Sequence, residues 1–311
     1  MNVRTIGFVA AAALVAACTS EKPAGQPGQE AQKPAPAGRT VTVKGSDTLV
    51  ILAQRLAERF MAENPGKTVQ VTGGGSGTGI AALINGTTDV ANASRPMKDA
   101  EKQQVQQKRG VPAIEHPVAL DGLAVYVNEK NPLQTLTLAQ LKAIYLGEVK
   151  NWKDLGGADA PIVLYGRENN SGTYAYFKEH VLADEDFAAE TQSLPGTAAV
   201  VNAVARDPNA IGYGGIAYGT GIRAVPVKKD EASPAIAPTM ENVTSGAYPI
   251  SRTLFMYTAG EPTGDVKAYI DFAQSDAGQK IAGDVGYYPL PKKAAAAPAE
   301  AGAEQPAAPA K

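Results

Sequence analysis

Three turns rich in Gly, Ser and Thr decide how this chain folds, and they read Gly45-Ser46-Asp47-Thr48, Gly73-Gly74-Gly75-Ser76-Gly77-Thr78-Gly79 and Gly166-Arg167-Glu168-Asn169-Asn170-Ser171-Gly172-Thr173. Each turn follows an apolar, β-rich run and precedes apolar residues at helical spacing, which predicts a strand, a turn and a helix. Free N–H groups and hydroxyls at a helix start favour anions. One such turn is usually an ordinary N-cap, whereas three in one chain predict a shared oxyanion site.

The segments around the turns predict an α/β protein. Strands are expected at 40–43, 68–72 and 89–91, with helices at 49–60, 80–84 and 99–109 between and after them. This βαβ order predicts parallel strands with helices on both faces. Past an apolar run that Asp121-Gly122 interrupts, a second block predicts helices at 138–145 and 174–182 and a strand at 162–165.

The end of the folded part, with a strand at 248–257 and helices at 265–274 and 278–282, is too short for a third domain. We therefore expect it to complete the first lobe. The predicted bounds are 39–120 plus 249–292 for lobe I and 121–248 for lobe II. Each lobe would be a mainly parallel sheet flanked by helices, with two hinge strands between the lobes and a small ligand bound in the cleft.

The N-terminal residues predict export and a lipid anchor. Arg4 precedes an apolar run over 6–17 that is too short for a typical transmembrane helix. The run ends Leu14-Val15-Ala16-Ala17-Cys18, which resembles a bacterial lipobox. We expect a signal peptide over 1–18, a lipidated Cys18, a flexible Pro/Gly/Gln/Ala-rich linker over 19–38 and a disordered tail over 293–311. The protein would then be anchored to a membrane in the periplasm or at the cell surface.

Composition excludes several classes of function. Lys and Arg number 29 against 31 Asp and Glu, which does not favour a nucleic-acid surface. Two histidines and one cysteine give no zinc-ligand spacing. The glycine turn at 73–79 has neither the Walker A Gly-Lys-Ser/Thr nor the dinucleotide Gly-x-Gly-x-x-Gly spacing. We expect a monomeric, non-enzymatic binding protein without catalytic residues, metal or cofactor.

Several motifs carry a family resemblance over about 39–290, namely Val43-Lys44-Gly45-Ser46-Asp47-Thr48, Gly74-Gly75-Ser76-Gly77-Thr78-Gly79-Ile80, the run from Arg167 to Thr173, Ile144-Tyr145-Leu146-Gly147 with Trp152 and Asp154-Leu155-Gly156 after it, and Ile211-Gly212-Tyr213. Together they resemble the phosphate-binding proteins of bacterial ABC importers, the PstS family. The resemblance implies a two-lobed periplasmic binding protein of type II, with inorganic phosphate and the permease subunits of an ABC transporter as partners.

The resemblance also implies which residues bind the phosphate: Ser46, Asp47, Thr48, Ser76, Gly77, Thr78, Ser94, Arg95, Arg167, Ser171, Gly172 and Thr173. Two positions depart from the pattern, because Arg95 and Asn169 stand where well-known members have aspartates. The first of those aspartates accepts a hydrogen bond from protonated phosphate. Here Asp47 is a candidate replacement or a plain N-cap, and Arg95 a candidate to favour the dianion.

The leading hypothesis is therefore a lipid-anchored receptor that captures phosphate and passes it to a permease. The alternatives are a receptor for sulfate or molybdate, a secreted phosphatase or esterase that uses Ser76 or Ser171, and a structural or adhesive lipoprotein. A serine hydrolase needs a base beside its nucleophile. The sequence positions of His116 and His180 do not suggest either histidine as that base.

Overall fold

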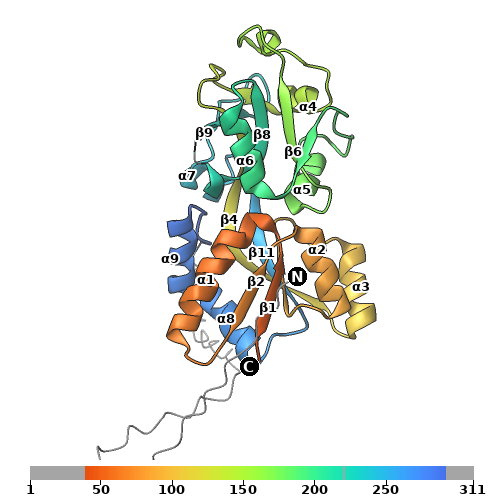
Figure 1. The fold of residues 1–311 in the computed structure, drawn as a ribbon, viewed down its shortest axis with the longest axis vertical. Helices are drawn as coiled ribbons and strands as arrows, with labels where there is room; N and C mark the ends of the chain where they lie inside the picture. The colour runs from red at the N-terminus through yellow and green to blue at the C-terminus, as the bar shows by residue number, and fades with distance from the viewer. Residues whose placement is uncertain (1–38, 220, 292–311) are drawn as a thin grey trace, which may run out of the picture. The chain divides into compact units, whose positions relative to one another are not determined.

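A computed structural model of the 311-residue chain describes residues 39–219 and 221–291. The expectations for the signal peptide, Cys18, the linker and the tail lie outside these residues. The described part is an α/β fold, with helices on both faces of a mixed, curled sheet (Figure 1). Among the described helices, none is long and apolar enough to cross a membrane.

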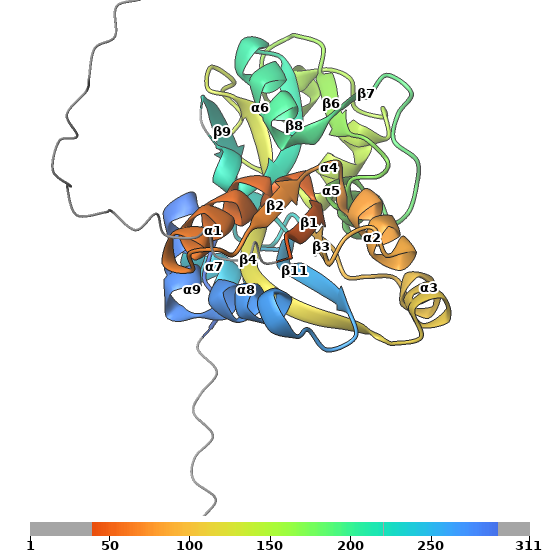
Figure 2. The ribbon, with the colours of Figure 1, turned by 60° about the horizontal axis from the view of Figure 1, so that its bottom comes forward.

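The first half of the fold, which we call lobe I, has the predicted βαβ order. Its elements are β1 (Val41–Gly45), α1 (Val50–Glu63), β2 (Val69–Thr72), α2 (Ser76–Asn85), β3 (Val90–Ala93), α3 (Asp99–Arg109), β11 (Ser251–Ala259), α8 (Gly264–Gln274), α9 (Asp276–Val285) and the first part of β4 (Ala113–Asn128). β1 lies between β2 and β3 and is parallel to both. α1, α8 and α9 cover one face of the sheet, and α2 and α3 cover the other (Figure 1, Figure 2).

The C-terminal helices pack against the first helix of the chain. The Phe60 ring of α1 contacts Tyr269 and Phe272 of α8, at centroid distances of 5.6 and 5.8 Å. The Tyr269 hydroxyl also donates to the carbonyl of Ala53. Aromatic burial of this kind stabilises the association of segments far apart in the sequence. The last helices therefore belong to the same core as the first.

The second half of the fold, lobe II, is built on the remainder of β4. Its elements are β5 (Leu136–Thr137), α4 (Leu138–Tyr145), β6 (Val163–Arg167), α5 (Gly172–His180), β7 (Gln192–Leu194), α6 (Gly196–Arg206), β8 (Ala210–Gly215), β9 (Ile222–Val225), β10 (Val227–Lys228) and α7 (Met240–Thr244). Short 3-10 turns lie at Asp47–Leu49, Trp152–Leu155 and Ile216–Tyr218. Two core clusters draw buried residues from 41–119 and 254–287, and two others from 123–250. The lobe bounds given by the sequence stay a prediction.

The strands of each lobe are mainly parallel, as expected, and every antiparallel pair includes one of the two crossing strands, β4 or β11. Its order is β2-β1-β3-β11-β4-β8-β6-β7, with β9 also on β4. β11 is antiparallel to both β3 and β4, and β4 is antiparallel to β8 and β9. β4 has 16 residues, pairs with β11 over 113–122 and continues to β8 from Leu123. The strands that carry the chain from one lobe to the other and back run in opposite directions, so the sheet is mixed.

Candidate functional site

The polar turns predicted from the sequence lie at the ends of four strands. Thr48 follows β1, Ser76 follows β2, Ser94 follows β3 and Thr173 follows β6. β1, β2 and β3 are parallel, so their carboxyl ends meet at one edge of the sheet. β6 runs in the opposite direction in lobe II, so its carboxyl end faces theirs and brings Thr173 to the same place. All four side chains are buried.

These four residues form a continuous chain of hydroxyls, which we call the hydroxyl cluster. The Oγ atoms of Ser76 and Ser94 are 3.3 Å apart, and Ser94 Oγ is 3.4 Å from Thr173 Oγ1. Thr173 Oγ1 is in turn 2.9 Å from Thr48 Oγ1. The Ser94 N–H donates to Ser76 Oγ. A hydroxyl both donates and accepts, so the cluster is able to turn several donors toward an oxyanion.

Two glycines allow the turns to approach so closely. Gly75 precedes α2 with φ +87°, and a Cβ on it would lie 2.7 Å from the carbonyl oxygen of Asn170. A Cβ on Gly172 would lie 2.3 Å from Ser76 Oγ and 2.8 Å from Ser94 Oγ. A larger residue at position 172 would displace the hydroxyl cluster, and one at position 75 would displace Asn170. This explains why both positions carry glycine.

Arg167 supplies the positive charge next to the hydroxyl cluster. It ends β6 and is 2% exposed. Its Nη2 lies 2.9 Å from Asp47 Oδ2, and its Nη1 donates to Thr197 Oγ1 at 2.8 Å. Burial lowers the pKa of Arg167 and the Asp47 carboxylate opposes that shift, but a guanidinium stays protonated in proteins.

Further contacts join the second and third turns. The Gly77 N–H donates to the Asn170 carbonyl at 2.9 Å, and Asn170 Nδ2 donates to the Gly74 carbonyl and, at 3.5 Å, to Thr78 Oγ1. The amide of Gly77 therefore already has a partner. The structure thus brings the three predicted turns together, with the first two facing the third.

Two predicted site residues have local roles in the structure. Ser171 is the N-cap of α5, where its hydroxyl accepts from the N–H groups of Thr173 and Tyr174. Ser46 is 2% exposed, its side chain makes no cap bond, and its N–H donates to the Asn92 carbonyl. Both residues shape the turns, while Thr48 and Thr173 present the hydroxyls.

Arg95 is the predicted site residue that the structure does not bring into the hydroxyl cluster. Its guanidinium makes two hydrogen bonds to Glu101, at 2.7 and 2.8 Å, and one to the Pro96 carbonyl. Glu101 also accepts from the Lys98 N–H at the start of α3. A bidentate partner in its own segment holds Arg95 in a local structure outside the hydroxyl cluster, and its contact with the anion stays a prediction.

Sequence reasoning missed three features around the site. Thr197 holds Arg167 from the start of α6, and the Tyr218 hydroxyl donates to the backbone carbonyl of Asp47. Burial, with a smaller contribution from Asp47, raises the pKa of Tyr218 to about 12. No local sequence pattern pointed to the contact of Tyr218 with the first turn.

The third missed feature is a buried ion pair on the crossing strands. Arg252 of β11 and Asp121 of β4 have side chains that are 1% and 0% exposed, and Arg252 Nε donates to Asp121 Oδ2 at 2.9 Å. Arg252 Nη1 also donates to the Ser94 carbonyl at 3.1 Å. A second cation therefore lies near the hydroxyl cluster. The signal available in the sequence was an arginine inside an apolar strand, together with the aspartate that interrupts the run in β4.

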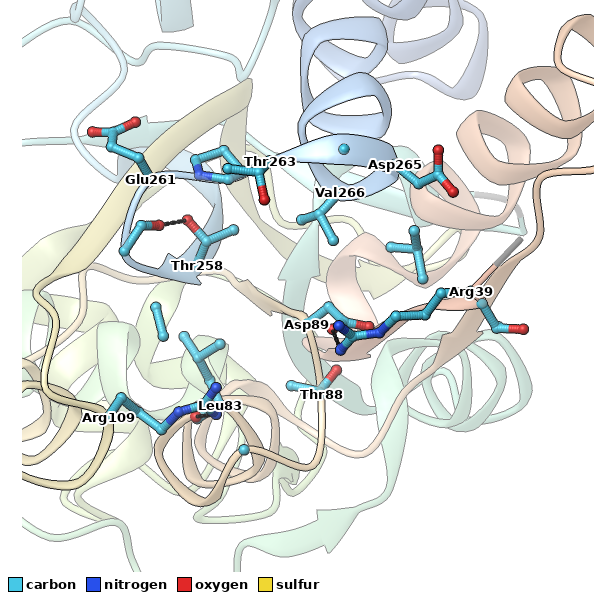
Figure 3. Close-up of a pocket in the computed structure, with 17 residues that line it drawn as sticks. Arg39, Leu83, Thr88, Asp89, Arg109, Thr258, Glu261, Thr263, Asp265 and Val266 are labelled. Carbon is cyan, nitrogen blue, oxygen red and sulfur yellow. Dashed lines mark hydrogen bonds and ion pairs between the residues drawn. The ribbon is translucent and has the colours of Figure 1, made fainter. Parts of the chain in front are cut away.

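A cavity of about 390 Å³ lies at the opposite end of β1, where residues of β1 and β11 line it (Figure 3). Arg39 there pairs with Asp89 at 2.6 Å, and Arg109 donates to the Leu83 carbonyl. Glu261 and Asp265 line the same space. Three carboxylates against two guanidinium groups give the cavity walls a net negative charge, which does not favour an oxyanion, so the hydroxyl cluster remains the candidate site.

The chemistry of the cluster is that of hydrogen-bond donation. Within 39–219 and 221–291, no three His, Cys, Asp or Glu side chains are grouped to hold a metal. His116 shares a hydrogen bond with Thr258, and His180 with the Tyr176 carbonyl. Buried hydroxyls beside one guanidinium and one carboxylate suit the binding of an anion.

Comparisons with known proteins agree with a protein that binds an anion. A family model described as a PBP superfamily domain matches residues 30–277. The phosphate-binding protein PstS of Pseudomonas aeruginosa is 36% identical over 304 residues, which cover 92% of each chain. PstS of Bacillus subtilis is 35% identical over 255 residues, or 82% of each chain.

Solved structures show the same architecture. A putative phosphate ABC transporter substrate-binding protein with bound phosphate from Clostridium perfringens matches with a TM-score of 0.74 and 32% identity, over 81% of this chain and 100% of that one. An ABC-type phosphate transport receptor from Vibrio cholerae matches with a TM-score of 0.66 and 28% identity, over 81% and 100%. By its sequence, its two-lobed fold and its strand-end donors, the chain belongs to the PstS family of phosphate-binding proteins.

Proposed function

We propose that this chain captures inorganic phosphate outside the cytoplasm and delivers it to the permease of an ABC transporter. The observation that carries the proposal is the hydroxyl cluster of Thr48, Ser76, Ser94 and Thr173 beside the buried Arg167. The P. aeruginosa and B. subtilis relatives are named for phosphate binding, and the C. perfringens neighbour holds bound phosphate.

Phosphate loses its hydration on burial, so the protein must replace water with directed donors. The four hydroxyls would donate to the phosphate oxygens, and Arg167 would supply charge and paired N–H groups. A hydrogen bond to a charged group contributes about 1.5 to 3 kcal/mol. Several such bonds are enough for micromolar or tighter binding after the ordering costs.

Asp47 would accept a hydrogen bond from a protonated phosphate oxygen. Its Oδ1 accepts from the Gly74 N–H at 2.8 Å and its Oδ2 pairs with Arg167. An ionised carboxylate only accepts, so it would repel a fully deprotonated anion such as sulfate. The alternative is that Asp47 only holds the second turn and the guanidinium in place.

Phosphate would reach the cluster when the two lobes separate. Thr48 meets Thr173, Asp47 meets Arg167 and Gly77 meets Asn170, in each case with one partner in lobe I and one in lobe II. Opening by hinge motion would part these contacts, and closing would bury the anion between the donors.

Titration calorimetry tests the proposal on protein that lacks residues 1–18 and has been stripped of bound ligand. Phosphate should give saturable heat with one site per chain, and sulfate and molybdate should not. No heat with phosphate but clear binding of another tetrahedral oxyanion would refute the substrate. The phosphate-binding neighbours do not favour sulfate or molybdate.

A phosphatase or esterase is the alternative from another class. In the described residues, the hydrogen bonds of His116 and His180 go to Thr258 and Tyr176. We therefore expect no turnover of a chromogenic phosphate ester. Turnover that Ser171→Ala abolishes would favour the enzyme instead.

We also propose that the chain is a monomer anchored through a lipid on Cys18. The support is the lipobox-like stretch at 14–18 and the linker composition of 19–38. Growth of an expressing bacterium with radioactive palmitate should label the wild-type chain, while Cys18→Ser should give an unlabelled one. Equal labelling of both chains would refute the anchor.

A further inference from the structure

A second cavity, of about 300 Å³, lies in lobe II behind Arg167, and Gly166, Arg167, Thr191 and Tyr213 are among its walls. β6 and β7 pair so that Arg167 is opposite Leu194, and β8 lies on the other side of β6. The cavity is therefore next to the guanidinium that adjoins the hydroxyl cluster, but it is formed by different elements.

Two buried polar atoms of the cavity walls, Arg167 Nε and Thr191 Oγ1, have no hydrogen-bond partner among the described residues. The Tyr213 hydroxyl oxygen accepts from the backbone N–H of Arg167, and its O–H has no acceptor among these residues. Nε–H only donates, whereas both hydroxyls donate and accept. Burial raises the pKa of Tyr213, so its hydroxyl stays protonated at neutral pH. A buried polar group without a partner is unfavourable by about 1 to 3 kcal/mol.

The other two nitrogens of the guanidinium have protein partners. Nη1 donates to Thr197 Oγ1 at 2.8 Å, and Nη2 lies 2.9 Å from Asp47 Oδ2. Thr197 is 1% exposed and follows β7 at the start of α6, so it lies at the same edge of the sheet as Arg167. Thr197 and Asp47 therefore hold the two Nη atoms and orient the guanidinium plane of Arg167.

We propose that the cavity holds ordered water that accepts from Arg167 Nε and bonds to Thr191 and Tyr213, and that this water and Thr197 position Arg167 for phosphate. Buried waters typically make about three hydrogen bonds to otherwise unsatisfied groups, which is the number of free partners here. A guanidinium recognises an oxyanion through a rigid planar fork, so its orientation sets the strength of the contact. This inference rests on the proposed phosphate function.

Thr197→Val tests the positioning role, because valine keeps the shape of threonine and removes the hydrogen-bond acceptor. We expect phosphate affinity to fall about tenfold in calorimetry on the full chain in detergent. Thr197→Ser restores the hydroxyl and should restore most of the affinity. Thermal unfolding without phosphate shows that each variant is folded.

A double-mutant cycle separates positioning from a merely structural effect. If Thr197 acts through Arg167, Thr197→Val will cause no further loss of affinity in an Arg167→Met background. The same tenfold loss in both backgrounds would overturn the positioning role.

Gly166→Ala tests the water. The new Cβ would lie 3.0 Å from Thr191 Cγ2 and 3.5 Å from the Tyr213 hydroxyl, within the cavity. A crystal structure of the phosphate-bound wild type should show a water on Arg167 Nε, and the variant should lose it along with several-fold affinity. The matched control is Gly283→Ala in α9, where the nearest atom lies 3.8 Å from the new Cβ and no change in affinity is expected.

The outcomes are distinguishable. A wild type that gives no heat with phosphate refutes the proposed function, whereas a wild type that binds while Thr197→Val binds equally well overturns only this inference. A phosphate-bound wild-type structure with no water, or with an anion, on Arg167 Nε also overturns it. If Thr197→Val does not fold, that crystal structure and Gly166→Ala decide the question.

Discussion

Arg167 is the last residue of β6 and Arg95 follows β3, and both were predicted to bind the anion, yet their surroundings differ. Arg167 has partners 30 and 120 residues away, and its Nε has no partner in the protein. The guanidinium of Arg95 bonds to Pro96 and Glu101, which lie within six residues of it. A guanidinium held by distant segments lies where elements meet, whereas one held by its own segment stabilises that segment.

The comparison is tested most directly by removing each arginine. Arg167→Ala should weaken phosphate binding by about 2 kcal/mol or more, because it removes a buried charge-assisted partner. Arg95→Ala should change phosphate affinity by less than about 0.5 kcal/mol, because the Arg95 guanidinium bonds to Pro96 and Glu101 and not to the hydroxyl cluster. Calorimetry on both variants measures the difference. Equal losses would contradict the contrast between the two arginines.

Gly172→Ala should have the next largest effect. Gly172 belongs to the same turn as Arg167 and lies against the hydroxyls of Ser76 and Ser94. The new Cβ would lie 2.3 Å from Ser76 Oγ, so the hydroxyl cluster has to move. Overpacking costs about 1 to 3 kcal/mol, and we expect phosphate binding to weaken by about 1.5 kcal/mol. Gly219→Ala is the control, since its nearest atom would be 3.6 Å away. Unchanged phosphate affinity in Gly172→Ala would show that the cluster is not the binding site.

Asp47→Asn should have a smaller effect on affinity and a clear effect on selectivity. Asparagine keeps the shape but replaces one acceptor oxygen by an NH₂ donor, so it no longer favours a protonated oxyanion. We expect phosphate binding at pH 7 to weaken by about 1 kcal/mol and sulfate binding to become detectable. Competition calorimetry with both anions measures this. A variant that still rejects sulfate as strongly as the wild type would leave Asp47 with only its role in the turn.

The sequence predicted the parts of the site that depend on local signals. Glycine before Ser76 and around Ser171 marks turns with special backbone needs, and the strands and helices around them follow from apolar spacing. The side-chain partners were not predictable in the same way. That Thr197 faces Arg167 depends on the pairing of β6 with β7, and that Arg252 faces Asp121 depends on the pairing of β11 with β4. Strand pairing is a tertiary property that periodicity does not encode.

Arg95 is the exception, because a local signal for its partner was present. Glu101 lies three residues after Lys98 at the start of α3, where its carboxylate accepts from the Lys98 N–H. A carboxylate fixed at that position is within reach of an arginine six residues earlier. The family resemblance implied that Arg95 lies in the site, whereas in the structure Glu101 holds it.

Glu101→Gln gives the smallest expected effect on binding and tests the structural role of the Arg95 segment. Burial raises the pKa of Glu101, but the hydrogen bonds from Arg95 and the Lys98 N–H outweigh it, so the pKa lies below its ordinary value of 4.5. A lowered folded-state pKa contributes stability above the unfolded pKa, and this stability is lost as the pH falls through the folded one. Thermal unfolding should show the variant less stable by about 1 kcal/mol at pH 7, and the difference should shrink below about pH 4.5.

Phosphate affinity of Glu101→Gln at pH 7 should stay within about twofold of wild type, since the pair does not touch the hydroxyl cluster. A stability difference that is the same at pH 7 and pH 3 would show that the ionised pair contributes nothing. A loss of phosphate affinity close to that of Arg167→Ala would show that Arg95, released from Glu101, acts on the anion after all. Either result would remove the distinction between an arginine that serves its own segment and one that serves the ligand.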